Sequence, residues 1–176
     1  MDNGSIYTKN LVNFLSEKKI KFVSQKFDEV NPSDMQQFNS FILSGRRKND
    51  KKINTVNSKI IKYTISEKKH LLGICYGAEI LTQTLGGTIK KSSNQVKGEE
   101  TVIVEKKNKI CQNKIDVFES HRYEISQLGN QLHCLASSKS CKYEIIKHNE
   151  HNIFGTQFHP EMSSDGLSII QAFLSL

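Results

Sequence analysis

Residues 70–81 read HLLGICYGAEIL, and this stretch decides the fold class. Its first five residues have the apolar composition of a buried strand, and the residues that follow the cysteine predict a helix. Gly73 and Gly77 flank Cys75 at two residues on either side. This spacing lets a strand turn sharply into a helix, and it lifts the side chain between the glycines above the sheet.

Strands and helices alternate in the first half of the chain, and the second half is rich in strands. Alternation with continuous apolar strands is typical of a parallel sheet that helices cover on both faces. We therefore predict one α/β domain over residues 1–176, with a mostly parallel central sheet to which the later strands add an antiparallel part. The expected helices are 7–18, 53–66, 78–85 and 166–174, and the expected strands are 21–27, 40–43, 70–74, 88–91, 100–106, 114–118, 131–135, 143–147 and 153–158.

The chain carries 25 Lys and Arg against 18 Asp and Glu, which gives a net charge of +7. A basic balance can indicate a nucleic-acid ligand, but the lysines are scattered, tryptophan is absent and no aromatic stripe accompanies them. We interpret them as a solvated surface and expect no nucleic-acid partner.

No apolar run approaches the roughly 20 residues of a membrane span. The first residues also lack the basic start and the apolar stretch of a secretory signal. We therefore expect a cytoplasmic protein without membrane association. The four cysteines form no C-x-x-C pair, so reduced thiols are expected, and no spacing supports a metal site.

Cys75 has the context of a nucleophile. The positive end of the following helix would face the sulfur and favour thiolate over thiol. Backbone N–H groups in the turn could also stabilise an oxyanion. A buried structural cysteine at a strand end is the alternative interpretation of this stretch alone.

A second motif supplies a base for this thiol. Residues 153–161 read IFGTQFHPE, a strand that delivers His159 at its end, with Glu161 two residues later. Nucleophilic catalysis by cysteine requires a base within hydrogen-bond reach, held by a third group. A surface His-Pro-Glu turn is the alternative, but the two motifs together favour a triad of Cys75, His159 and Glu161.

Residues 73–77 (GICYG) and 155–161 (GTQFHPE) together resemble the class I glutamine amidotransferases, which are glutaminase domains of the triad type. The resemblance extends over essentially the whole chain, since residues 2–5 (DNGS), 41–45 (FILSG) and 119–121 (ESH) also fit the family. It implies a flavodoxin-like α/β fold and hydrolysis of glutamine through a glutamyl thioester.

The resemblance also implies roles for further residues. Backbone N–H groups of Gly45 or Arg46 and of Tyr76 would form the oxyanion hole. Glu79 and the Ser120–His121 segment would contact glutamine. This half of the reaction requires no metal or organic cofactor on this chain.

Within the family, the likeness is strongest to the separate-chain glutaminase subunits of GMP synthases. It implies an ATP-pyrophosphatase synthetase partner, which would use ATP and Mg²⁺ on its own side and receive the ammonia for GMP synthesis from XMP. Two alternatives remain open. One is a stand-alone hydrolase of γ-glutamyl bonds, and the other is a binding or regulatory subunit that has lost turnover.

Several positions depart from the family pattern. The oxyanion loop reads Ser-Gly-Arg-Arg at residues 44–47, where a second glycine is usual, so a distorted oxyanion hole is expected. Glu79 stands where glutamine is usual, and Tyr123 replaces an aspartate. The apolar strand that normally precedes Asp2 is missing or truncated, so we expect the true start of the chain to lie upstream.

Overall fold

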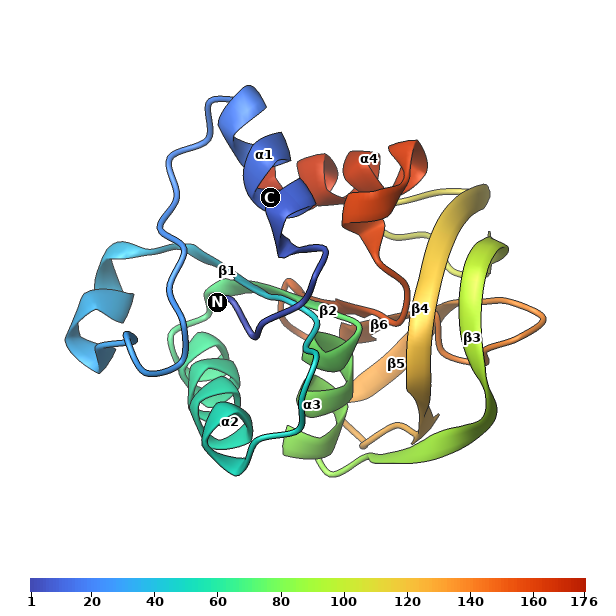
Figure 1. Cartoon of the computed structure of the whole chain (residues 1–176), viewed down its shortest axis with the longest axis horizontal. Coiled ribbons are helices and arrows are strands. Elements are labelled where there is room, and N and C mark those ends of the chain that lie inside the picture. The colour runs from blue at the N-terminus through green and yellow to red at the C-terminus, as the bar shows by residue number, and fades with distance from the viewer.

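The computed structural model describes all 176 residues and contains one seven-stranded sheet with helices on both faces (Figure 1). The elements follow the chain as α1 (Thr8–Glu17), η1 (Pro32–Gln37), β1 (Ser40–Leu43), α2 (Lys51–Ser66), β2 (His70–Ile74), α3 (Tyr76–Thr84), β3 (Thr88–Val104), β4 (Lys114–Gln127), β5 (Leu132–Ser137), β6 (Ile145–His148), β7 (Ile153–Thr156), η2 (Pro160–Met162) and α4 (Ser164–Leu174).

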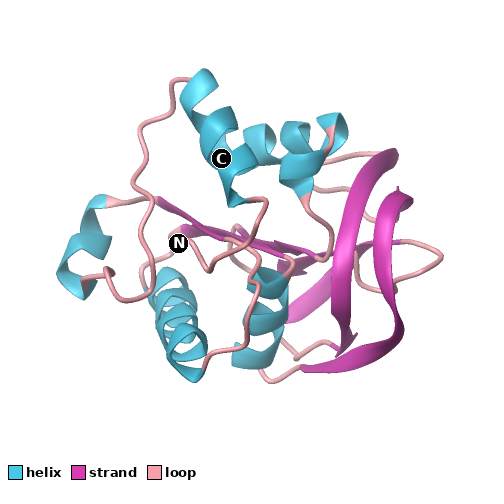
Figure 2. Ribbon diagram, in the orientation of Figure 1, coloured by secondary structure: helices cyan, strands magenta, loops and turns pink.

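The strand order in the sheet is β1-β2-β7-β6-β5-β3-β4. β2 pairs in parallel with β1 on one side and with β7 on the other. The remaining four pairings are antiparallel, and the β3–β4 hairpin forms the tall, curved end of the sheet (Figure 2). The predicted α/β class is therefore confirmed. Its parallel part is limited to three strands, β1, β2 and β7, of which β2 and β7 carry the two motifs.

Two helical layers cover the parallel strands. Side chains alternate between the faces of a strand, so Leu72 and Ile74 of β2 pack with α1 and α4, whereas Leu71 packs with α2 and α3. Figure 1 shows these helix pairs on opposite sides of the sheet. None of the helices is both long and apolar enough to span a membrane.

Two of the expected strands merge, and one is not formed. Residues 88–91 and 100–106 belong to a single strand, β3, and the strand expected at 114–118 continues to Gln127, because the two pair along most of their length with bulges between. The strand expected at 21–27 was wrong, because this segment has almost no neighbour with which to pair. Only an isolated bridge between Asp2 and Lys26 joins it to the chain start.

The chain start lies between β1 and this segment. The Met1 amino group donates to the Ile42 carbonyl at 2.8 Å, and the Asp2 amide donates to the Gln25 carbonyl at 2.8 Å. A cavity of about 360 Å³ opens beside Met1, lined mainly by α1, β1 and residues 20–25. Burial lowers the pKa of the Met1 amino group to about 6, although the Asp2 charge raises it.

Candidate active site

Cys75 lies at the turn between β2 and α3, with φ +50° and ψ −104°. Both glycines of the motif are required by close packing. A Cβ at Gly73 would lie 2.5 Å from the Gly77 carbonyl carbon, and a Cβ at Gly77 would lie 2.3 Å from the Leu43 carbonyl oxygen. The Cys75 amide donates to the Thr156 carbonyl at 2.7 Å, which ties the turn to β7. The predicted nucleophile elbow is thus formed.

The thiol of Cys75 is buried, with a residue exposure of 8%. Burial raises its pKa, and the nearby carboxylates Glu79, Glu119 and Glu161 raise it further, while a hydrogen bond from the Tyr76 backbone N–H lowers it. The helix start therefore lowers the thiol pKa as expected, but the expected net preference for the thiolate is wrong for this buried site. Desolvation of the charged form outweighs the helix start.

His159 and Glu161 form a buried pair at the end of β7. Nδ1 of His159 lies 2.9 Å from Oε1 of Glu161, and the two residues are 3% and 4% exposed. The His159 amide donates to the Phe118 carbonyl at 2.9 Å, and the Tyr7 ring packs against the imidazole at a centroid distance of 4.6 Å. Because Nδ1 faces the carboxylate, Nε2 is left to exchange a proton with a reacting group.

The loop after β1 approaches this imidazole. A Cβ at Gly45 would lie 2.9 Å from Cε1 of His159, so only glycine fits there without displacement. The Arg46 guanidinium stacks 3.9 Å from the Tyr76 ring centroid, and its Nη1 donates to Asn54 at 2.9 Å. Neither Gly45 nor Arg46 has a positive φ, so an arginine fits this loop without backbone strain.

Glu79 lies on the first turn of α3 and is 4% exposed. Burial raises the pKa of its carboxyl group, and the charge of Arg46 is the largest influence that lowers it. The Gln157 side-chain amide lies 3.5 Å from Oε1 of Glu79. Glu79 therefore faces the same end of the sheet as Cys75.

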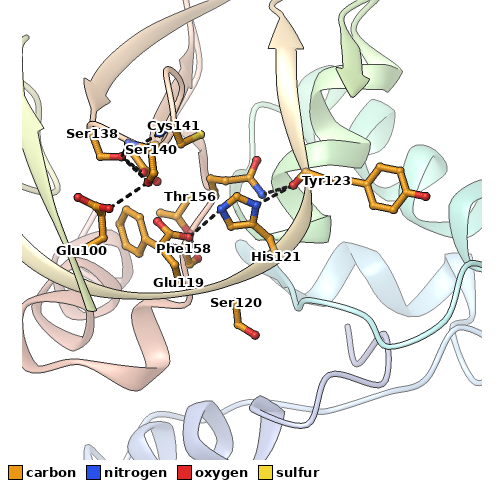
Figure 3. A network of polar contacts seen from close by, with 12 residues as sticks. Glu100, Glu119, Ser120, His121, Tyr123, Ser138, Ser140, Cys141, Thr156 and Phe158 are labelled. Carbon is orange, nitrogen blue, oxygen red and sulfur yellow. Dashed lines mark hydrogen bonds and ion pairs between the residues drawn. The ribbon is translucent and has the colours of Figure 1, made fainter. Parts of the chain in front are cut away.

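The Ser120–His121 segment lies on β4 (Figure 3). The Tyr7 hydroxyl donates to Oγ of Ser120 at 3.2 Å. Figure 3 shows the His121 ring between Glu119 and the Tyr123 backbone, while the Tyr123 side chain points away from the network. That side chain belongs to a residue that is 43% exposed.

Sequence reasoning assigned no role to Glu119, Glu144 or Gln157. All three are almost fully buried, and all three join the network around His121. A signal for Glu119 was present, because it continues the alternate apolar positions Ile115 and Val117. Glu144 gave no comparable signal, because it comes just before β6 begins.

Comparison with known proteins agrees with this geometry. The family model "Glutamine amidotransferase class-I" matches residues 1–174. A glutamine-hydrolyzing GMP synthase subunit of Methanococcus aeolicus is 27% identical over 98% of this chain and 93% of its own length. The protein of the same name from Saccharolobus solfataricus is 25% identical over 100% of this chain and 98% of its own length.

Solved structures agree as well. A crystal structure from Thermoplasma acidophilum, provisionally assigned to the same GMP synthase subunit, superposes with a TM-score of 0.88 at 27% identity, covering 99% of this chain and 90% of that one. A glutamine amidotransferase from Thermotoga maritima shares the fold, with a TM-score of 0.76 at 18% identity over 94% and 76% of the two chains. The chain belongs to the class I glutamine amidotransferase family.

Proposed function

We propose that this chain hydrolyses glutamine to glutamate and ammonia, and that it supplies the ammonia to a GMP synthase of the two-chain type. One observation supports this proposal most strongly: a cysteine in a strained turn and a buried His–Glu pair lie at the same end of two adjacent parallel strands, β2 and β7. The names of the nearly full-length relatives support the choice of pathway.

The first half of the reaction forms a thioester. As Sγ of Cys75 attacks the glutamine side-chain carbonyl carbon, its proton passes to Nε2 of His159, because the resting thiol is neutral. Backbone N–H groups at Gly45, Arg46 and Tyr76 would hold the oxyanion. His159 then gives the proton to the leaving nitrogen, the C–N bond breaks, and ammonia departs.

The second half releases glutamate. His159 takes a proton from water, the resulting hydroxide attacks the thioester carbonyl, and the C–S bond breaks as Cys75 regains a proton. Glu161 keeps the imidazole oriented through the contact at Nδ1. No step in this scheme uses a metal or organic cofactor on this chain.

Ammonia must reach its acceptor before bulk water protonates it. We therefore propose a synthetase partner of the ATP-pyrophosphatase kind, with ATP and Mg²⁺ bound on that partner and XMP as the acceptor. The proposed substrate contacts on this chain are Glu79 and the Ser120–His121 segment.

Glutamate release from glutamine tests the proposal. The assay compares wild type with Cys75→Ala, and it uses Cys141→Ala as the control because Cys141 is another buried cysteine. Each protein is assayed alone and with a GMP synthase ATP-pyrophosphatase subunit, ATP, Mg²⁺ and XMP. Turnover that requires Cys75, tolerates Cys141→Ala and rises with the partner is expected. Turnover of γ-glutamyl peptides without partner dependence would favour a stand-alone hydrolase. No turnover in any mixture would refute the proposal.

A further inference from the structure

The core-facing row of β4 changes from apolar to ionisable beside the active site. Alternate residues of this strand point inward, and the row Ile115, Val117, Glu119 and His121 is buried throughout. The change occurs next to Phe118, whose carbonyl accepts the hydrogen bond from the amide of the triad histidine. Burying an acid and a base is costly unless each has a partner, so their partners indicate their role.

His121 is held between two acceptors. Its Nδ1 lies 2.9 Å from the Tyr123 carbonyl oxygen, and its Nε2 lies 3.2 Å from Oε2 of Glu119. A carbonyl oxygen can only accept, so Nδ1 carries a proton, whereas Nε2 faces the Glu119 carboxyl group at contact distance without forming a hydrogen bond. The side chains of Glu119 and His121 are each 1% exposed, so water does not replace either partner.

A second buried carboxyl group completes the cluster. Glu144 is 0% exposed, bonds to the Glu119 carboxyl group on one side and accepts from the Ser138 hydroxyl at 2.6 Å on the other. Two carboxyl groups bond to each other only when they share a proton. Burial raises the pKa of Glu144, and the charge of Glu119 raises it further. Burial also raises the pKa of Glu119, to about 7, and the pKa of Glu144 is raised further, to about 9, so Glu144 holds the shared proton in preference to Glu119.

Contacts lead from this cluster to the elbow helix. The Tyr123 carbonyl that accepts from His121 also accepts from Nε2 of Gln157 at 3.3 Å. The same amide nitrogen lies 3.5 Å from Oε1 of Glu79, one turn after the nucleophile on α3. A shift of the His121 ring would therefore disturb both proposed groups of substrate contacts.

We propose that Glu119 is a positioning residue for glutamine binding. It holds the His121 ring, and the ring fixes the Ser120–His121 backbone and, through the Tyr123 carbonyl, the orientation of Gln157 next to Glu79. This inference rests on the proposed function. Glu119 makes no hydrogen bond or ion pair with either triad side chain, so its removal should act mainly on substrate binding, although its charge also contributes to the raised pKa of the Cys75 thiol.

Kinetics of Glu119→Gln, with Glu144→Gln as the matched control, test this role. Glu119→Gln removes the carboxyl group beside His121, so the KM for glutamine should rise roughly 10- to 100-fold while kcat stays within about threefold. Glu144→Gln keeps a donor toward Glu119 and should leave both constants within about twofold. An unchanged KM in Glu119→Gln, or an equal rise in both variants, would overturn the inference.

Nitrogen-15 NMR of the imidazoles gives a readout that needs no turnover. The ring signals of His121, identified by their loss in His121→Gln, should move in Glu119→Gln and stay in place in Glu144→Gln. Unmoved His121 signals in Glu119→Gln, with an active wild type, refute the inference alone. Signals that move in Glu119→Gln while the wild type has no glutaminase activity refute the proposed function and, with it, the kinetic role of Glu119.

Discussion

Glu144→Gln should make the protein less sensitive to rising pH. In the folded state burial raises the pKa of Glu144, and the Glu119 charge raises it further, so its carboxyl group keeps a proton that the unfolded chain has already released. Stability falls with pH wherever the folded state holds more protons than the unfolded state. The wild type is therefore penalised as pH rises above the ordinary range of a glutamic acid.

The size of the effect follows from linkage. One extra proton in the folded state costs about 1.4 kcal/mol of unfolding free energy per pH unit. Between about pH 6 and pH 8 this amounts to roughly 3 kcal/mol, or on the order of 5–10 °C in Tm for a domain of this size. Glutamine has no proton to lose and still donates toward Glu119, so the variant escapes this loss.

Urea denaturation at several pH values measures the effect. The difference in unfolding free energy between Glu144→Gln and wild type should grow with pH, because all other titrating groups are common to the two proteins. Ser138→Ala serves as the control, because it removes the hydroxyl that donates to Glu144 without removing the acid. Parallel curves for wild type and Glu144→Gln would refute the shared-proton arrangement.

Three further changes test other parts of the structure. Gly77→Ala should lower the unfolding free energy in urea by more than about 3 kcal/mol, because its Cβ meets a β1 carbonyl, whereas Gly86→Ala, with φ +85° and open space, should cost only about 1–2 kcal/mol. Burial raises the pKa of Glu79, and the charge of Arg46 opposes this rise. Arg46→Met should therefore shift the pH profile of kcat/KM for glutamine to higher pH, and an unchanged profile would contradict the charge effect. About four apolar β-branched residues added before Met1 should enter the adjacent cavity and raise Tm by several degrees, measured by calorimetry, against a serine extension that should not.

The strand-to-helix turn at Cys75 and the His159–Glu161 pair could be predicted from the sequence because their determinants are local. A glycine two residues before and two residues after Cys75 is a direct consequence of how closely β2, α3 and β1 approach one another. His159 and Glu161 are likewise separated by one residue, so a single turn after β7 brings them together. The spacing of these residues in the sequence was therefore enough to predict both features.

The protonation of the site could not be predicted in this way. The Tyr76 backbone N–H at the helix start lowers the pKa of the Cys75 thiol, but burial raises it more, and carboxylates on α3, β4 and η2 raise it further. The Glu119–Glu144 contact joins β4 to the residue before β6, and β3 and β5 separate these strands in the sheet order. No periodicity in the sequence predicts this contact, because the contact depends on how the sheet curves.

The two departures at Arg46 and Glu79 are explained only when they are considered together. Considered singly, an arginine in the oxyanion loop suggests a distorted site, and a glutamate on the elbow helix places a carboxylate next to the nucleophile. In the structure Arg46 lies over Tyr76, and Tyr76 and Glu79 are three residues apart on α3, so they share a helix face. The guanidinium charge offsets part of the burial cost of the carboxylate. Replacing Arg46 alone would remove this influence and leave the Glu79 carboxylate with the full cost of its burial.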